Sequence, residues 1–212
     1  MVTRWSNSPL ARIRSSASPG NSPWVAMAET LLGDVNSQRL LFVAGADFHE
    51  GIVGLVASRL TDAHYRPTLV MRASEDGVRG SARSIEGFHI TRALDQCAGL
   101  LTRYGGHEAA AGFSLDIENL DRLRDGLMAH CVAVLDKETL RPRLRVDAIV
   151  KLAHIDREAV EALAALEPTG QENEPARLAT LGLELCATRA VGSQGRHLQF
   201  HVSDGTRSMR GI

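Results

Sequence analysis

Short apolar runs and helical periods follow one another between residues 37 and 137. Four short runs, each bounded by turn residues, predict strands: residues 39–45, 68–71, 78–84 and 113–117. Apolar positions three and four residues apart, or apolar stretches with interleaved small residues, predict four helices: residues 24–36, 51–60, 89–104 and 120–137. This alternation of strands and helices predicts an α/β domain over 37–137, with the helix over 24–36 linking it to the chain before it.

The pattern changes after Pro142. Residues 144–150 alternate between apolar and polar positions, which predicts a half-exposed strand. Residues 197–202 alternate strictly, and 178–190 predicts one or two more strands. Asp156 is a suitable N-cap for a helix that ends before Pro168. Residues 141–212 therefore predict a small β domain that stops in the middle of a sheet.

The start of the chain has no apolar period. Residues 1–23 are rich in Ser, Pro, Asn and Arg, which predicts a disordered tail. The whole chain has 212 residues, of which 44% are hydrophobic and 23% charged, so wholesale disorder and a fibrous repeat are excluded. No stretch approaches the roughly 20 apolar residues of a membrane span. The three cysteines form no CxxC pair, so we expect reduced thiols in a cytoplasmic protein.

The charge is unevenly distributed although the net charge is only −1. Of the 24 basic residues, only Lys137 and Lys151 are lysines. Arginine suits bidentate binding of phosphate, but the codon usage of a GC-rich genome would also explain the excess. Basic residues dominate 141–151 and 189–212, which allows a local site for a polyanion.

Residues 105–112 (GGHEAAAG) form the most unusual string. Gly105 and Gly106 let a backbone approach a ligand closely, and the alanines that follow predict the start of a helix. Free N–H groups at a helix start attract anions, and His107 adds a donor whose charge responds to a nearby phosphate. The string is a candidate anion pocket, although a tight turn between two helices would use the same residues.

Two further strings carry groups suited to phosphate. In 80–84 (GSARS), Arg83 offers a guanidinium fork, and Ser81 and Ser84 offer hydroxyl donors. An exposed strand with a solvated arginine is the alternative. His49 lies in a loop at the carboxyl end of a predicted strand, where α/β proteins bind ligands, but a histidine there also serves as a helix cap.

Taken in order, these strings resemble one family. Residues 49–60 (HEGIVGLVASRL), 66–68 (RPT), 80–84 and 105–112 are similar to the C-terminal half of the RecJ family, single-strand-specific DNA exonucleases of the DHH phosphoesterase superfamily. Residues 166–175 resemble that family's linker into an oligonucleotide-binding (OB) barrel. The GGHxxAAG string alone is shared with oligonucleotide phosphodiesterases and with a module of alanyl-tRNA synthetase.

The resemblance implies a fold and a set of roles. It implies a DHH-associated α/β domain over 37–137, a mixed sheet with flanking helices that binds substrate, followed by an incomplete OB-like domain over 141–212 that binds nucleic acid. Arg83 with Ser81 and Ser84 would hold a backbone phosphate of single-stranded DNA. The phosphate near the scissile bond would lie against Gly105, Gly106 and His107, and His49 would lie at the edge of the cleft.

The family cuts DNA with Mn2+ or Mg2+ held by an N-terminal domain that carries an Asp-His-His run. This sequence has no such run, and His197 and His201, on one face of a predicted strand, would be about 13 Å apart, too far for one metal. We therefore expect no catalytic residue, no metal site and no nuclease activity in this chain alone. An OB barrel needs five strands, and three or four can be counted before Ile212.

Three functions remain open at this point. The chain is the substrate-binding part of a 5′-to-3′ single-stranded-DNA exonuclease of DNA repair and recombination, or a stand-alone single-strand-binding module. In either case the partner would be an upstream or separately encoded DHH domain. The third function is that of an oligonucleotide phosphodiesterase relative. The linker and the strands after it favour the first two, since the short oligonucleotide enzymes lack an appended OB barrel.

Overall fold

The structure is a computed structural model that describes residues 22–170 and 173–212. The tail predicted for residues 1–23 lies outside the described residues, apart from Ser22 and Pro23. The chain divides after Pro142 into two compact units, which are described one at a time. Among the described helices, none has the length and apolar character needed to cross a membrane.

The first unit is built on a five-stranded mixed sheet with the order β1-β2-β3-β5-β4. Only the pair β1 and β2 is parallel, and the other neighbours are antiparallel. The strands have these bounds: β1 Leu41–Gly45, β2 Thr68–Ser74, β3 Gly77–Arg83, β4 Arg103–Gly106 and β5 Ala110–Leu115. The sheet confirms the α/β fold class with a mixed sheet.

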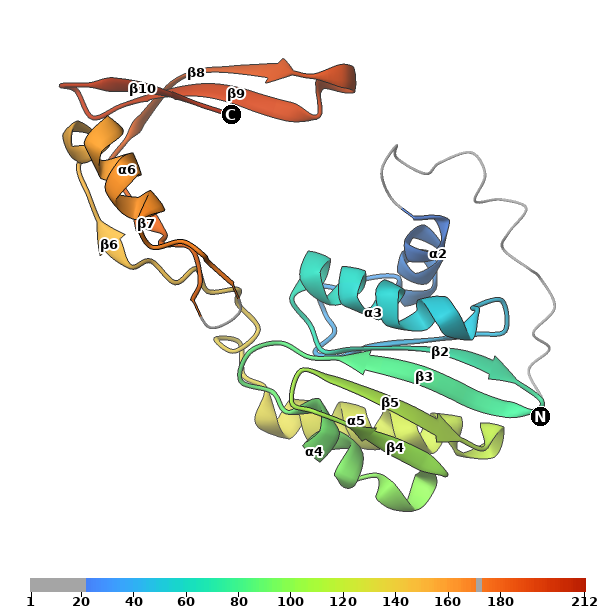
Figure 1. The fold of residues 1–212 in the computed structure, drawn as a ribbon. Coiled ribbons are helices and arrows are strands. Elements are labelled where there is room, and N and C mark those ends of the chain that lie inside the picture. Colours follow the sequence, from blue (N-terminus) through green and yellow to red (C-terminus); the bar gives the residue numbers. More distant parts are fainter. Residues whose placement is uncertain (1–21, 171–172) are drawn as a thin grey trace. The chain divides into compact units, whose positions relative to one another are not determined.

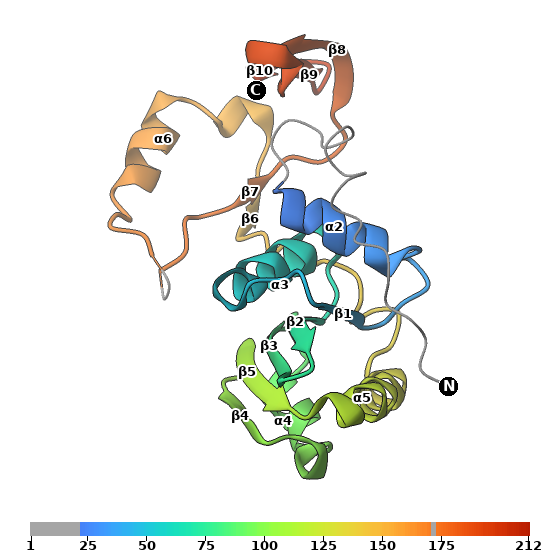
Figure 2. The same cartoon turned by 90° about the vertical axis from the view of Figure 1, so that its right-hand side faces the viewer.

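Helices cover both faces of this sheet. Helices α2 and α3 lie on one face and α4 and α5 on the other, as two views at right angles show (Figures 1 and 2). Their bounds are α2 Pro23–Leu32, α3 Glu50–His64, α4 Ile90–Asp95 and α5 Leu120–Val134, with short 3₁₀ turns at Ala98–Leu100 and Ile117–Asn119. Helix α3 packs on β2 and β3. Strands β5 and β4 are farther along the sheet, so α3 does not pack on them in the same way.

Two apolar clusters, one on each face, hold the unit together. Side chains of α2 and α3 meet the sheet in one cluster, which includes Val25, Ala28, Val43, Val56, Leu60 and Val70. Side chains of α4 and α5 meet the opposite face in the other, which includes Leu69, Met71, Phe88, Phe113, Leu123 and Leu127. On β5 the buried residues alternate with open ones, so each strand of the sheet divides its side chains between the two faces.

The structure corrects two predicted elements in this unit. The helix predicted over 89–104 is only the six residues of α4, followed by a 3₁₀ turn and by strand β4. The helix start predicted after Gly106 is the turn of a hairpin, because β4 and β5 pair with each other and β5 pairs with β3. The pairing of the backbone outweighs the helix preference of the alanines.

The second unit contains a three-stranded antiparallel sheet with the order β10-β9-β8 and a separate short parallel pair, β6 and β7. Its elements are β6 Ala148–Ile149, a 3₁₀ turn at Leu152–His154, α6 Arg157–Ala164, β7 Leu178–Ala179, β8 Glu184–Val191, a 3₁₀ turn at Ser193–Gly195, β9 His197–Ser203 and β10 Ser208–Gly211. Asp156 caps α6 as the sequence predicts, accepting a hydrogen bond from the Ala159 N–H at 2.9 Å. The strand predicted over 144–150 is limited to two residues.

Candidate nucleic-acid interface

Three strands carry a shared set of side chains on the face that α3 only partly covers. The register places Arg79 of β3 opposite Ser114 of β5, and Ser114 opposite Arg103 of β4. The next row along consists of Ser81, Gly112 and Gly105. Neighbouring strands are about 4.8 Å apart, so each row is a short line of side chains across the sheet.

All residues of these two rows except Ser81 line an open groove of about 550 Å³. We call it the glycine groove and define it by these residues: Glu50, Val53, Arg79, Arg103, Gly105 and Gly112. A Cβ atom added at Gly105 or at Gly112 would meet no heavy atom within 4 Å. Both glycines are exposed, so the floor of the groove is open and a ligand backbone has room to lie directly on the sheet.

Arg83 follows Ser81 on the same face of β3, one row beyond Gly112 and Gly105, and its guanidinium has a fixed orientation. Its Nη1 donates to the Ser81 hydroxyl at 2.7 Å and to the Ala82 carbonyl at 2.9 Å. A Cβ atom at Gly54 of α3 would lie 3.2 Å from Nη2 of this arginine, so the absence of a side chain at Gly54 lets the guanidinium lie close against the helix. The structure thus brings Arg83 and Ser81 together, as an arginine oriented by a serine, and their binding of a phosphate stays a prediction.

His107 occupies the turn of the β4–β5 hairpin at the same end as Arg83. Its N–H donates to the Ala110 carbonyl at 2.8 Å, and its carbonyl accepts from the Thr91 hydroxyl at 2.7 Å. Gly106 must be glycine here, because a Cβ atom would lie 2.2 Å from the Ala110 carbonyl oxygen. The predicted helix-start anion pocket is therefore wrong in its local structure. The exposed His107 side chain and the two glycines stay together on the β4–β5 hairpin, and β5 separates them from Arg83 on β3.

Ser84 differs from the role that the resemblance implies. Its hydroxyl donates to the Phe88 carbonyl, and its N–H donates to the Ala109 carbonyl at 2.9 Å. The only hydroxyl hydrogen is therefore used inside the loop that leads to α4, which leaves none for a phosphate. Ser84 instead ties this loop to the hairpin turn that carries His107.

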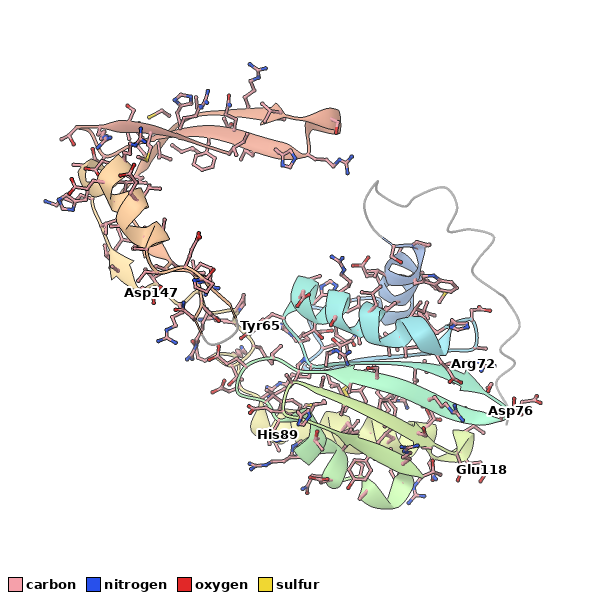
Figure 3. All side chains as sticks on the ribbon, viewed as in Figure 1. Tyr65, Arg72, Asp76, His89, Glu118 and Asp147 are labelled. Carbon is pink, nitrogen blue, oxygen red and sulfur yellow. The ribbon has the colours of Figure 1, made fainter. Side chains whose placement is uncertain are left out.

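His49 lies at the other end of the sheet. It is the N-cap of α3, and its Nδ1 accepts from the Gly51 N–H at 3.2 Å. Helix α3 follows the carboxyl end of β1, where Gly45 pairs with Arg72. Figure 3 shows Arg72 and Asp76 at this end of β2 and β3, and Tyr65 and His89 at the opposite end. The structure therefore does not bring His49 together with His107 and Arg83.

Arginines that the sequence reasoning missed gather near His49. Arg72, Arg79 and Arg103 line a second depression of about 600 Å³ that continues the glycine groove. The Glu50 carboxylate bridges two of them, with Oε1 at 3.4 Å from Arg72 Nη1 and Oε2 at 3.2 Å from Arg79 Nη1. We call Arg72, Arg79 and Arg103 the arginine cluster. The alternation of residues 79, 81 and 83 on one strand was the available signal for Arg79.

Tyr104 marks the boundary between the groove and the opposite face. Its hydroxyl donates to the Asp95 carboxylate at 2.9 Å, and this hydrogen bond, followed by desolvation and the nearby negative charge, raises the pKa of Tyr104 above its ordinary value. The tyrosine stays neutral at physiological pH and ties β4 to the end of α4.

The groove offers no ligand set for a metal ion. Over the part of the chain that the structure describes, no group of three His, Cys, Asp or Glu side chains could hold one. The residues present therefore do not fit a resident divalent cation, and the chemistry of the groove is that of guanidinium, hydroxyl and backbone N–H donors.

Comparisons with known proteins assign both units. Residues 37–131 match the family model of the DHHA1 domain, and residues 146–212 match that of the RecJ OB domain. The chain is 33% identical over 167 residues to the single-stranded-DNA-specific exonuclease RecJ of Bacillus subtilis, covering 78% of this chain and 21% of that protein. The enzyme of the same name from Escherichia coli is 30% identical, with 74% and 27% covered.

Solved structures give the same result. The crystal structure of RecJ from Thermus thermophilus in complex with Mn2+ matches with a TM-score of 0.67 and 27% identity, over 82% of this chain and 26% of that chain. The Mg2+ complex of the same protein matches with a TM-score of 0.64 and 28% identity, covering 82% of this chain and 27% of that one. The chain spans about a quarter of the length of the proteins it matches. It corresponds to the C-terminal DHHA1 and OB region of the RecJ family of exonucleases.

Proposed function

We propose that this chain is the substrate-binding, C-terminal portion of a 5′-to-3′ single-stranded-DNA exonuclease of the RecJ type, and that the glycine groove holds the DNA backbone. The observation that carries the proposal is the open glycine floor between Arg83 at one end and the arginine cluster at the other. A floor without side chains admits a sugar-phosphate backbone, and guanidinium groups at both ends match its charge.

The residues of the groove would bind and orient the strand. Arg83 supplies a charge-assisted donor that Ser81 already holds in place, so little side-chain freedom is lost on binding. His107 adds a second donor at the same end of the groove. Because contacts from these groups to backbone phosphate carry no base information, binding would be independent of base sequence. Residues Arg143–Ile212, which match the RecJ OB domain, would bind further nucleotides of the same strand.

Hydrolysis is assigned to a part of the enzyme that these residues do not include. The described residues do not fit Mg2+ or Mn2+, whereas the two T. thermophilus RecJ structures are complexes with these ions. We propose that a metal-binding DHH domain, upstream or separately encoded, is the partner that performs the cleavage. Addition of such a domain to this chain should restore digestion, and manganese-dependent digestion by the pure chain alone would contradict the assignment.

The binding role is tested with three variants and a fluorescent single-stranded oligonucleotide. Arg83→Ala removes a charge-assisted contact that is typically worth about 1.5–3 kcal/mol, so we expect roughly 10-fold to 100-fold weaker binding. Arg83→Lys keeps the positive charge but loses the planar guanidinium, so its affinity for the oligonucleotide should lie between that of the unchanged protein and that of Arg83→Ala. His107→Ala should also weaken binding, to a smaller extent.

Arg59→Ala is the matched control for Arg83→Ala. Arg59 is an exposed arginine of α3 that lies near Trp24 and away from the sheet, so its loss changes the net charge equally without touching the groove. We expect less than a twofold change. Affinity for the oligonucleotide should fall steeply with salt, since phosphate contacts release counterions. Unchanged affinity of folded Arg83→Ala at low salt would remove the groove from the binding site.

A further inference from the structure

The arginine cluster contains its own competing anion. Glu50 lies in the first turn of α3, and its two carboxylate oxygens contact Arg72 and Arg79 separately. In contrast, within the described residues the Arg103 guanidinium makes no ion pair and no hydrogen bond. One cluster therefore combines two arginines that are partly neutralised with one that is free, around a depression of about 600 Å³.

These ion pairs are weak enough to be exchanged for a ligand. The side chains of Arg72, Arg79 and Glu50 are 42%, 69% and 41% exposed, and exposed pairs of this kind contribute about 0–1 kcal/mol each. The distances of 3.4 Å and 3.2 Å are longer than the usual 2.7–2.9 Å of strong charge-assisted hydrogen bonds. A phosphodiester entering the depression could therefore displace the carboxylate.

The cluster is separated from Arg83 by the length of the glycine floor. Arg79 and Arg83 are four residues apart on one face of β3, which corresponds to about 13 Å. A stacked single strand advances about 3.4 Å per nucleotide. A strand held at Arg83 must therefore extend by about four stacked nucleotides before it reaches Arg79, and a dinucleotide is too short to fill both ends.

We propose that the arginine cluster is a second phosphate subsite and that Glu50 occupies it in the free protein, as an internal competitor that a sufficiently long strand displaces. This proposal rests on the proposed function of the groove. The consequence is a length preference, because short fragments gain only the contacts at Arg83 and His107. Longer strands gain the arginine cluster as well, after displacing the carboxylate.

The test compares Glu50→Gln with Asp76→Asn. Both changes raise the net charge by one, and both residues line the depression. Asp76 lies between β2 and β3, and among the described residues it forms no ion pair with the cluster. Glu50→Gln should bind a single-stranded 12-mer about 3-fold to 10-fold more tightly than the unchanged protein at low salt, whereas Asp76→Asn should change it less than twofold. Neither variant should alter binding of a dinucleotide.

Two further measurements make the result unambiguous. In a background in which Arg72 and Arg79 are both replaced by alanine, the gain from Glu50→Gln should shrink to less than twofold, because both ion pairs that it releases are already absent. Equal thermal unfolding curves verify that the variants are folded. The proposal is overturned if Glu50→Gln leaves 12-mer affinity unchanged, weakens it, or matches Asp76→Asn. If Arg83→Ala still weakens binding in that case, the proposed function stands and only the role of Glu50 fails.

Discussion

Gly80 and Gly112 are close neighbours in the sheet, but they lie on opposite faces and have different surroundings. A Cβ atom at Gly80 would lie 2.3 Å from Cζ of Phe113 and 2.8 Å from Cβ of Met71, inside the core beneath the sheet. A Cβ atom at Gly112 would meet no heavy atom within 4 Å. The first glycine is needed for packing, and the second leaves space for a ligand.

This difference predicts opposite effects of substitution. Gly112→Val should leave stability close to its original value and weaken oligonucleotide binding at least several-fold, because its side chain fills the groove floor. Gly80→Ala should cost about 1–3 kcal/mol in the free energy of unfolding, as overpacking does. Both predictions are checked by measuring urea unfolding and oligonucleotide binding on each of the two variants. A strongly destabilised but fully binding Gly112→Val would contradict the groove.

Cys131 predicts a pH dependence of stability. Burial in the core beneath α5 raises its pKa from 9.0 to about 12. Below pH 9 the thiol is neutral in both folded and unfolded chains, so its stability contribution is fully present. Between pH 9 and about 12 only the unfolded chain ionises, and the free energy of unfolding should fall by up to about 1.4 kcal/mol per pH unit. Cys131→Ala, although less stable, should lose this part of the slope in urea titrations across that range.

The hairpin of β4 and β5 could be predicted only in part from its own sequence. Ala111, Phe113 and Leu115 are buried and alternate with open residues, so the two-residue period begins before residue 113. The strand predicted from the sequence begins only at residue 113, because alanine has the highest helix propensity. Strand pairing with β3, a contact distant in the sequence, decides the conformation. Most other elements of the first unit were predicted, since their apolar periods are local.

The functional face was only partly predictable for the same reason. Ser81, Arg83 and the glycines were recognised as candidates from local strings. Arg103 could not be connected with Arg79, because they share a face only through the pairing of both strands with β5. Glu50 reaches the cluster from the first turn of α3, a different element from the strands that carry the arginines. Such relations depend on register, which one sequence does not determine.

Arg39 lies just before β1, the edge strand of the sheet, and its side chain binds the end of α5. Its Nη1 donates to the carbonyls of Val132 and Leu135, two groups that a helix end otherwise leaves to solvent. Arg39→Met keeps the alkyl chain but removes both bonds, so the free energy of unfolding should fall by about 1.5–3 kcal/mol. Hydrogen exchange should accelerate first in the last turn of α5. Unchanged exchange there would show that the cap is dispensable.

At the scale of the whole molecule, apolar burial is unequal between the two units. Both apolar clusters belong to residues before Pro142. In Arg143–Ile212 only Leu152 is buried among the described residues, and large side chains such as Leu185 and Leu198 are 60% and 53% exposed. Because buried apolar surface is the main source of stability, the first unit should carry nearly all the unfolding free energy.

A chain ending at Pro142 tests this division. Since no residue of the two clusters is removed, the shortened chain should unfold in one cooperative transition within a few degrees of the full chain. In the full chain, amides of β8, β9 and β10 should exchange faster than those of β2, β3 and β5, because their side chains bury little surface. The shortened chain should also keep the effect of Arg83→Ala on oligonucleotide binding. A large fall in its melting temperature would mean that Arg143–Ile212 stabilises the first unit, and the assignment of nearly all the unfolding free energy to the first unit would then be wrong.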